Sequence, residues 1–278
     1  MKKLLLILLS PVVALSAYAQ SGYEKPSTGL MAMAGDIKEA HASPVPNNSA
    51  PEEFNQMIKF ATTDGKEGSA FYVPSDQPTG NALIIFHESW GLNDYIKKEA
   101  KRWQEQLGNV DVYAVDMYDG QVATGAEEAD KISAALSKKR GEAILKGLIA
   151  KVGINKRVAT LGWGTGGAWA LNMAMLMGND AAGCVIYYGL PEKDEEKIKA
   201  IETDVLYIYA TKDASIRKDD VDQFEKQVIA TQHTFERHDY PLTHAFTNPN
   251  DPQFAAKEAK EAEVYVLEFL KKRLTPVK

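Results

Sequence analysis

Positions 164, 213 and 244 follow one another in the order of a nucleophile, an acid and a base, but the first of them is glycine. Residues 157–167, RVATLGWGTGG, read as an apolar strand that runs into G-x-X-x-G, the strand-to-helix turn that normally presents Ser or Cys as a nucleophile. The central position is Gly164. Asp213 follows the apolar run DVLYIYA, and His244 lies in DYPLTHAF. An acid and a base for acyl transfer are therefore present, and the attacking side chain is absent.

The glycine has opposite consequences for stability and for activity. A nucleophile on such a turn adopts a backbone conformation that costs about 1 to 3 kcal/mol when the residue has a Cβ, and glycine avoids most of that cost. Deleting the nucleophile of a triad loses on the order of 10⁶ in kcat and leaves roughly 10³ to 10⁴ over water. We therefore expect a stable fold and a collapse of activity. Any turnover that persists would be weak and carried by a water molecule that His244 activates.

Strands and helices that alternate along the chain must position these residues. Residues 55–62 and 69–74 flank the turn at Asp64 and Gly65 and predict an antiparallel hairpin. Further strands are expected at 81–88, 110–118, 157–162, 181–189, 204–210 and 234–241. Helices are expected at 93–107, 125–152, 166–178, 192–201 and 252–274. This order predicts an α/β domain over 54–278, with a mostly parallel, doubly wound sheet flanked by helices.

The first 53 residues read differently. Lys2 and Lys3 precede an apolar run over residues 4–15, and Ala-Tyr-Ala at 17–19 resembles a cleavage site. We expect a signal peptide at 1–19, cleaved near Ala19, and a flexible linker at 20–53, which is rich in Ser, Pro, Asn and Ala. The mature protein would then be secreted or periplasmic, without a membrane anchor.

Composition excludes several function classes. The net charge of −6 without a Lys/Arg cluster argues against nucleic acid or an anionic membrane as a partner. Cys184 is the single cysteine, so no internal disulfide can form, and its apolar surroundings predict a core position. The five histidines show no metal-ligand spacing, and no cofactor fingerprint follows a strand, so neither a metal nor a cofactor is expected.

Four segments in order carry a resemblance to a known family. FHESWGLN at 86–93, GWGTGG at 162–167, ATKDASI at 210–216 and YPLTHAF at 240–246 are similar to motifs of the dienelactone hydrolase family of α/β-hydrolases. The resemblance covers the chain from about residue 54 to its end. It implies the α/β-hydrolase fold and the cleavage of a lactone or small carboxylic ester.

The resemblance also implies a role for individual residues. Asp213 would be the acid, His244 the base and Glu88 the carboxylate that interacts with the nucleophile, whose position falls on Gly164. The oxyanion hole would consist of the backbone N–H groups of Ser89 and Thr165, which survive any change of side chain. Their hydroxyl groups are not expected to replace the nucleophile, because neither residue stands at the elbow position.

The aromatic and imidazole side chains near the motifs have less specific interpretations. Trp90 and Trp163 flank the expected pocket and could contact an apolar or aromatic ligand, although simple packing explains them equally well. Trp169, on the helix after the elbow, is expected in the core, and His87 is expected to be structural.

Three hypotheses remain open from the sequence. The leading one is an exported dienelactone-hydrolase-like enzyme that acts on a small ester or lactone. The alternative is a non-catalytic descendant, a pseudoenzyme that binds a small molecule in the same pocket. In a third, the glycine at 164 is a laboratory replacement of cysteine.

Overall fold

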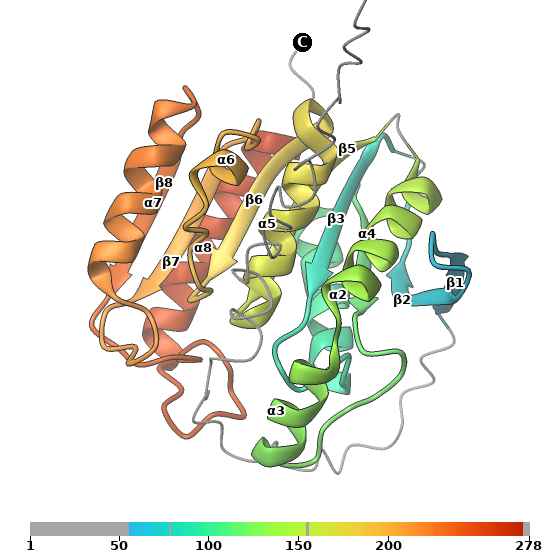
Figure 1. Cartoon of the computed structure of the whole chain (residues 1–278), viewed down its shortest axis with the longest axis horizontal. Helices are drawn as coiled ribbons and strands as arrows, with labels where there is room; N and C mark the ends of the chain where they lie inside the picture. The colour runs from blue at the N-terminus through green and yellow to red at the C-terminus, as the bar shows by residue number, and fades with distance from the viewer. Residues whose placement is uncertain (1–55, 78, 154–155, 275–278) are drawn as a thin grey trace, which may run out of the picture.

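The computed structural model describes residues 56–77, 79–153 and 156–274, which form an eight-stranded sheet covered by helices (Figure 1). The expected signal peptide and linker, residues 1–53, lie outside this range. The strands are β1 (Met57–Ala61), β2 (Glu67–Val73), β3 (Asn81–Phe86), β4 (Asp111–Asp116), β5 (Arg157–Trp163), β6 (Ala181–Tyr187), β7 (Val205–Ala210) and β8 (Phe235–Tyr240). The helices are α2 (Asp94–Leu107), α3 (Ala126–Ala135), α4 (Lys138–Val152), α5 (Thr165–Met177), α6 (Glu195–Ile198), α7 (Lys218–Ala230) and α8 (Ala256–Leu274), with a 3₁₀ turn at Gly178–Asp180.

The sheet has the order β1-β2-β4-β3-β5-β6-β7-β8. β1 pairs antiparallel with β2, and β2 pairs antiparallel with β4, whereas the other neighbouring pairs are parallel. The predicted α/β fold, with a mostly parallel sheet and an opening antiparallel hairpin, is confirmed. The six strands from β3 to β8 are joined by parallel pairing, so their carboxyl ends lie at one edge, where a doubly wound sheet places its ligands.

Helices cover both faces of the sheet. α2 and α8 contact each other, and α8 packs on β5, β6 and β7, behind the sheet in Figure 1. α5 packs in front on β3, β5 and β6, next to α4. The central strands are buried on both faces, which explains their continuous apolar runs.

The helix expected over 125–152 is wrong in one respect, because the structure contains two helices there. α3 ends at Ala135, Leu136 adopts an extended backbone conformation, and Ser137 caps α4 by accepting a hydrogen bond from the Arg140 N–H. Serine competes with the helix for backbone donors, so it starts a new helix more readily than it continues one.

Two other expected helices are shorter than predicted. The segment 192–201 is helical only over Glu195–Ile198, capped by the Asp194 carboxylate, which accepts from the N–H groups of residues 196 and 197. The last helix begins at Ala256 instead of Pro252. The carboxylate of Asp251 accepts a hydrogen bond from the Gln253 N–H at 2.7 Å, and this local turn replaces a helical start.

The core contains the residues predicted for it. Cys184 on β6 is fully buried, and burial raises the pKa of its thiol to about 12, so the residue behaves as a small hydrophobe. Trp169 on α5 is also buried, with its ring against Gly141 of α4, where an added Cβ would lie 2.1 Å from a ring atom.

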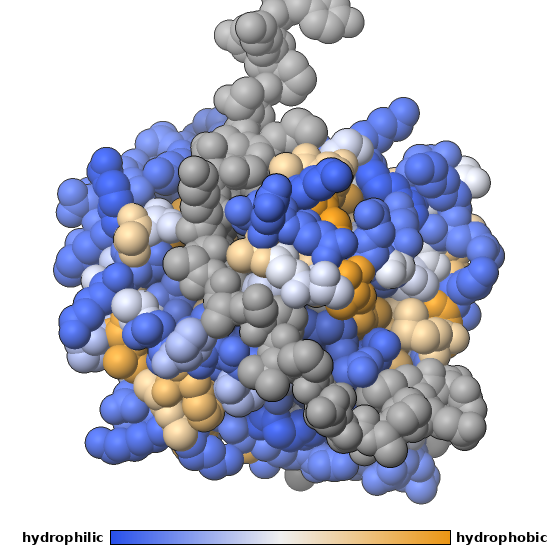
Figure 2. Space-filling model, turned by 90° about the horizontal axis from the view of Figure 1, so that it is seen from below, coloured by the Kyte–Doolittle hydropathy of each residue, from blue (hydrophilic) through white to orange (hydrophobic). Residues whose placement is uncertain are grey.

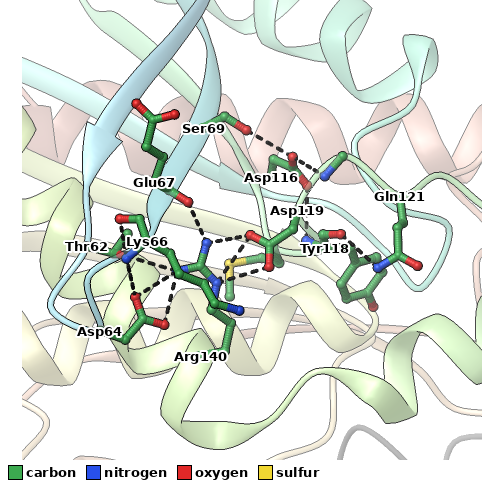
Figure 3. Close-up of polar contacts among 12 residues, drawn as sticks. Thr62, Asp64, Lys66, Glu67, Ser69, Asp116, Tyr118, Asp119, Gln121 and Arg140 are labelled. Atoms are coloured by element: carbon green, nitrogen blue, oxygen red, sulfur yellow. Dashed lines mark hydrogen bonds and ion pairs between the residues drawn. The ribbon is translucent and has the colours of Figure 1, made fainter.

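A buried guanidinium joins the hairpin to the helical layer. Arg140 of α4 binds the Asp64 carboxylate at 3.1 Å, the Asp119 carboxylate, the Thr62 hydroxyl at 2.9 Å and the Glu67 carbonyl at 2.6 Å (Figure 3). We call these residues the Arg140 cluster. It links the turn between β1 and β2 to the loop after β4, and it pairs the buried charge with two carboxylates.

Candidate active site

The elbow at Gly164 retains the backbone geometry of a nucleophile turn. Gly164 lies between the last residue of β5 and the first residue of α5, with φ 52° and ψ −121°, a conformation that favours glycine. Its N–H donates to the Tyr187 carbonyl at 3.0 Å, and its carbonyl accepts from the Gly167 N–H at 3.0 Å. The turn is therefore fixed on both sides by hydrogen bonds, although no side chain projects from it.

Two flanking glycines bring the elbow close to the end of β3. A Cβ added at Gly162 would lie 2.1 Å from the Gly166 carbonyl oxygen. A Cβ added at Gly166 would lie 2.4 Å from the carbonyl oxygens of both Phe86 and His87. The first turn of α5 therefore packs directly on the backbone that leads into Glu88 and Ser89.

The predicted acid and base lie in direct contact. His244 Nδ1 is 2.6 Å from Asp213 Oδ2, and the Asp213 side chain is 1% exposed. The other carboxylate oxygen accepts from the Ser215 N–H at 2.8 Å, which fixes the carboxylate. With the Nδ1 proton directed at the carboxylate, the second ring nitrogen, Nε2, is the atom that can accept a proton from a nucleophile.

Glu88 is buried, at 3% exposure, in a set of polar groups that we call the Glu88 cluster and that reaches His244 through the Tyr188 ring. Its carboxylate accepts from the Asn248 side-chain amide at 3.0 Å and from the Tyr188 hydroxyl at 3.4 Å. The Tyr188 hydroxyl also lies 2.6 Å from the Thr247 hydroxyl. The Tyr188 ring stands edge-on to the His244 imidazole, with 4.9 Å between the ring centroids. Burial raises the pKa of Tyr188 well above its usual range, so the phenol stays neutral and donates.

Sequence reasoning missed the roles of Tyr188, Thr247 and Asn248. Tyr188 directly follows β6 and has φ 37°, a rare conformation for a residue with a Cβ. Such backbone strain concentrates at functional sites, but it is invisible in a sequence. Thr247 and Asn248 stand three and four residues after His244, so proximity to the base is the signal that could have identified them.

The N–H groups expected to form the oxyanion hole belong to two buried residues. Ser89 and Thr165 are both buried, at 3% and 5% exposure. Thr165 is the first residue of α5, and the first N–H groups of a helix have no partner within the helix. The helix N-terminus also carries partial positive charge, which favours an oxyanion.

A cavity of about 250 Å³ opens beside the elbow, between α2, α8 and the loop after β8. Trp163 and Tyr187 line it with stacked rings, 5.6 Å apart and 22° from parallel, and Tyr95, Arg102 and Phe254 contribute further side chains. Trp163 thus lies where a ligand could contact it. Trp90 is buried at 4% exposure and does not line this cavity.

Three further observations concern metal ligands, membrane spans and the surface. Within the part of the chain that the structure describes, no group of three His, Cys, Asp or Glu residues is arranged to hold a metal ion. None of the described helices is long and apolar enough to cross a membrane. Viewed towards the carboxyl ends of the parallel strands, the surface is mostly hydrophilic, with separate hydrophobic patches (Figure 2).

The sheet order, the glycine elbow and the Asp213–His244 pair together define the α/β-hydrolase fold. The model of the dienelactone hydrolase family matches residues 69–274, and the chain belongs to that family. The family predicted from the four motifs is confirmed.

Individual relatives match most of the chain at low identity. A proposed carboxymethylenebutenolidase of Aquifex aeolicus is 26% identical over 228 residues, covering 78% of this chain and 97% of the relative. Protein usf of Aquifex pyrophilus is 26% identical over 233 residues, covering 79% and 99%. The crystal structure of a dienelactone hydrolase-like promiscuous phosphotriesterase from metagenomic libraries has a TM-score of 0.66 at 22% identity, covering 79% of this chain and 98% of that one.

Proposed function

We propose that this protein hydrolyses small carboxylic esters or lactones by direct attack of a water molecule that His244 activates. The observation that carries the proposal is the 2.6 Å contact between His244 Nδ1 and Asp213 Oδ2. The elbow is connected to this pair through Tyr187, whose carbonyl accepts from the Gly164 N–H, and through Tyr188, whose ring stands edge-on to the imidazole. Because Gly164 has no side chain, no covalent nucleophile stands at the elbow, and we assign the attack to a water molecule.

The reaction requires one displacement. The water oxygen attacks the carbonyl carbon while its proton moves to His244 Nε2, and Asp213 stabilises the imidazolium. The N–H groups of Ser89 and Thr165 hold the carbonyl oxygen as it gains negative charge. The tetrahedral intermediate collapses, the bond to the leaving oxygen breaks, and His244 returns its proton to that oxygen. An ester gives an acid and an alcohol, and a lactone gives a hydroxy acid.

The typical contributions of the remaining groups to kcat predict slow turnover. A single oxyanion donor contributes roughly 10² to 10³ in kcat, and general-base catalysis contributes about 10² to 10⁴. The covalent step, which divides the barrier into two smaller ones, is missing. Activated esters and strained lactones are therefore the expected substrates, because their uncatalysed hydrolysis has the lowest activation free energy.

The remaining site residues have supporting roles in this proposal. We assign Trp163 a contact with the apolar part of the substrate, because its ring lines the cavity next to the elbow. Gly164, Asp213 and His244 are not among the residues that line this cavity. Trp90 follows Ser89 directly, and its buried side chain is assigned a packing role. The carboxylate of Glu88, held by Tyr188 and Asn248, fixes the Tyr188 ring against His244 and so maintains the orientation of the base.

A second candidate function is binding without turnover, which the glycine at position 164 specifically favours. Selection for hydrolysis would act to keep a nucleophile, whereas selection for binding would require only the cavity and the oxyanion donors. In this form a small carbonyl compound would occupy the same site and leave unchanged.

One assay distinguishes the two functions. The wild-type protein, His244→Ala and Gly164→Cys would be tested with p-nitrophenyl acetate and a panel of lactones. His233→Ala is a matched control, because its imidazole lies in a cleft lined by residues from the opposite edge of the sheet. Turnover that His244→Ala removes and His233→Ala retains supports hydrolysis. A ligand-dependent rise in Tm without turnover supports binding instead. If neither occurs, both proposals are wrong.

We also propose that the chain is exported, on the strength of residues 1–19. Intact-mass analysis of the protein from cell fractions of its native host tests this. A mature chain that begins at Gln20 outside the cytoplasm supports export, and a full-length chain in the cytoplasm contradicts it.

A further inference from the structure

We infer that His87 is a positioning residue that holds the peptide between Glu88 and Ser89 in one orientation and so fixes the direction of the Ser89 N–H. The contribution of that N–H to catalysis rests on the proposed function, whereas the orientation of the peptide does not.

Both ring nitrogens of His87 are engaged, and this determines the tautomer. The Met117 N–H donates to Nε2 at 3.2 Å, so Nε2 carries no hydrogen. The hydrogen is therefore on Nδ1, which donates to the Glu88 carbonyl oxygen at 2.6 Å. His87 is 3% exposed, and burial lowers the pKa of its imidazole, which keeps the ring in this neutral form.

A trans peptide transmits this contact to the next residue. The carbonyl and N–H groups of one peptide unit lie in a plane and point in opposite directions. The Glu88 carbonyl accepts from His87 Nδ1 on one side and from the Gly91 N–H, at 3.3 Å, on the other. Fixing this oxygen fixes the direction of the Ser89 N–H. A rotation of the peptide would leave the buried Nδ1–H without an acceptor, which is unfavourable.

The segment that donates to His87 Nε2 is itself held in place by hydrogen bonds. Met117 directly follows β4, and the Asp116 carboxylate holds the turn there by accepting from the Tyr118 N–H at 3.0 Å and from the Ser69 hydroxyl at 2.9 Å (Figure 3). The Tyr118 ring packs edge-on against the His87 imidazole, with 4.6 Å between the centroids. The imidazole is thus clamped between the ends of β3 and β4.

The peptide between Glu88 and Ser89 follows a segment that packs against the elbow. Gly166 approaches the His87 carbonyl so closely that an added Cβ would lie 2.4 Å from it, which places the start of α5 against this segment. The Glu88 side chain has its own partners, Tyr188 and Asn248, so His87 acts on the main chain independently of the Glu88 cluster.

Two substitutions separate positioning from a merely structural role. In His87→Phe the ring volume remains, but both hydrogen bonds are lost. In His87→Asn the side-chain amide nitrogen stands as many bonds from Cα as Nδ1 does, so it can donate to the Glu88 carbonyl. We expect crystal structures to show a rotated 88–89 peptide in His87→Phe and the wild-type orientation in His87→Asn. The same orientation in all three proteins would overturn the inference.

The kinetic test compares the effect of each substitution on kcat with its effect on KM. Because an oxyanion forms only in the transition state, His87→Phe should lower kcat for p-nitrophenyl acetate by about 10- to 100-fold with little change in KM, and His87→Asn should recover most of the loss. A rotated peptide with unchanged kcat would contradict the proposed oxyanion role of Ser89 and leave the inference about His87 intact. If wild-type turnover is absent, the crystal structures still decide the inference.

A measurement on the unmodified protein covers the case in which His87→Phe does not fold. The ¹⁵N chemical shifts of the His87 imidazole should show a protonated Nδ1 and an unprotonated Nε2 throughout the neutral pH range. The opposite tautomer, or a charged ring, would overturn the inference, because neither could accept from Met117 and donate to Glu88 at the same time.

Discussion

The Arg140 cluster and the Glu88 cluster both surround carboxylates with polar groups, but the groups that donate to the carboxylates differ. In the Arg140 cluster, a guanidinium satisfies Asp64 and Asp119, and the contacts join the hairpin to α4. In the Glu88 cluster, a phenol and an amide, from Tyr188 and Asn248, donate to the carboxylate, and the Tyr188 ring stands edge-on to His244. The Arg140 contacts tie structural elements together, whereas Glu88 and Tyr188 directly follow strand ends, where this type of fold places its ligands.

If this contrast is correct, changes near the Glu88 cluster should affect chemistry far more than stability. The largest effect is expected for Gly164→Cys. A thiol at the elbow, beside an imidazole that Asp213 orients, restores covalent catalysis and should raise turnover of p-nitrophenyl acetate by about 10³-fold. The positive φ should lower the free energy of unfolding by about 1 to 3 kcal/mol. Steady-state kinetics and thermal unfolding measure both. Unchanged turnover in a folded variant would mean that the elbow no longer faces the base.

The Arg140 cluster should show the reverse behaviour. Arg140→Met keeps the aliphatic contacts but leaves Asp64 unpaired, and we expect a loss of about 2 to 3 kcal/mol in the free energy of unfolding. The value lies below that for a fully buried pair because the Asp119 side chain is 44% exposed. Turnover should stay close to that of the wild type. Urea denaturation measures the stability of the variant, and the p-nitrophenyl acetate assay measures its turnover. A large loss of turnover without a loss of stability would contradict the proposed difference between the Arg140 cluster and the Glu88 cluster.

A smaller effect is expected within the Glu88 cluster itself. Tyr188→Phe removes the hydroxyl that lies between Glu88 and Thr247 but keeps the ring that packs on His244. We expect a loss of stability of about 1 kcal/mol and a fall in kcat, since Glu88 loses a donor. Thr247→Val is the matched control, because it removes only the other partner of the same hydroxyl. A Tyr188→Phe protein with unchanged kcat would show that the cluster is structural.

The smallest effect concerns the pH dependence of stability. The Thr62 hydroxyl, the Lys66 N–H and the nearby Arg140 hold the pKa of Asp64 below its usual value, against the opposing effect of burial. Because the folded pKa is depressed, the ionised Asp64 stabilises the fold above its unfolded pKa of about 3.9, and this contribution disappears as the pH falls through the lower folded value. Asp64→Asn should therefore have a lower Tm than wild type near neutral pH, and the difference should shrink in acid. A constant difference across the pH range would contradict this.

The parts of the molecule that could be predicted from the sequence are those specified by local patterns. The apolar strands, the G-x-X-x-G turn and the positions of Asp213 and His244 follow from runs of neighbouring residues. The break between α3 and α4 was missed because a single serine inside a charged helical pattern gives a weak signal. The contacts of His87 with Met117, and of Glu88 with Tyr188 and Asn248, join residues 30, 100 and 160 positions apart, so they emerge only from the packing of strand ends.

The central claim, that water attacks the substrate directly, is tested most directly by intact-mass spectrometry during hydrolysis of p-nitrophenyl acetate. The account predicts that the wild-type chain stays unmodified while product accumulates, and that Gly164→Cys carries an acetyl group. An acetylated wild-type chain, formed and released at the rate of turnover, would show that another side chain is the nucleophile and would contradict the account.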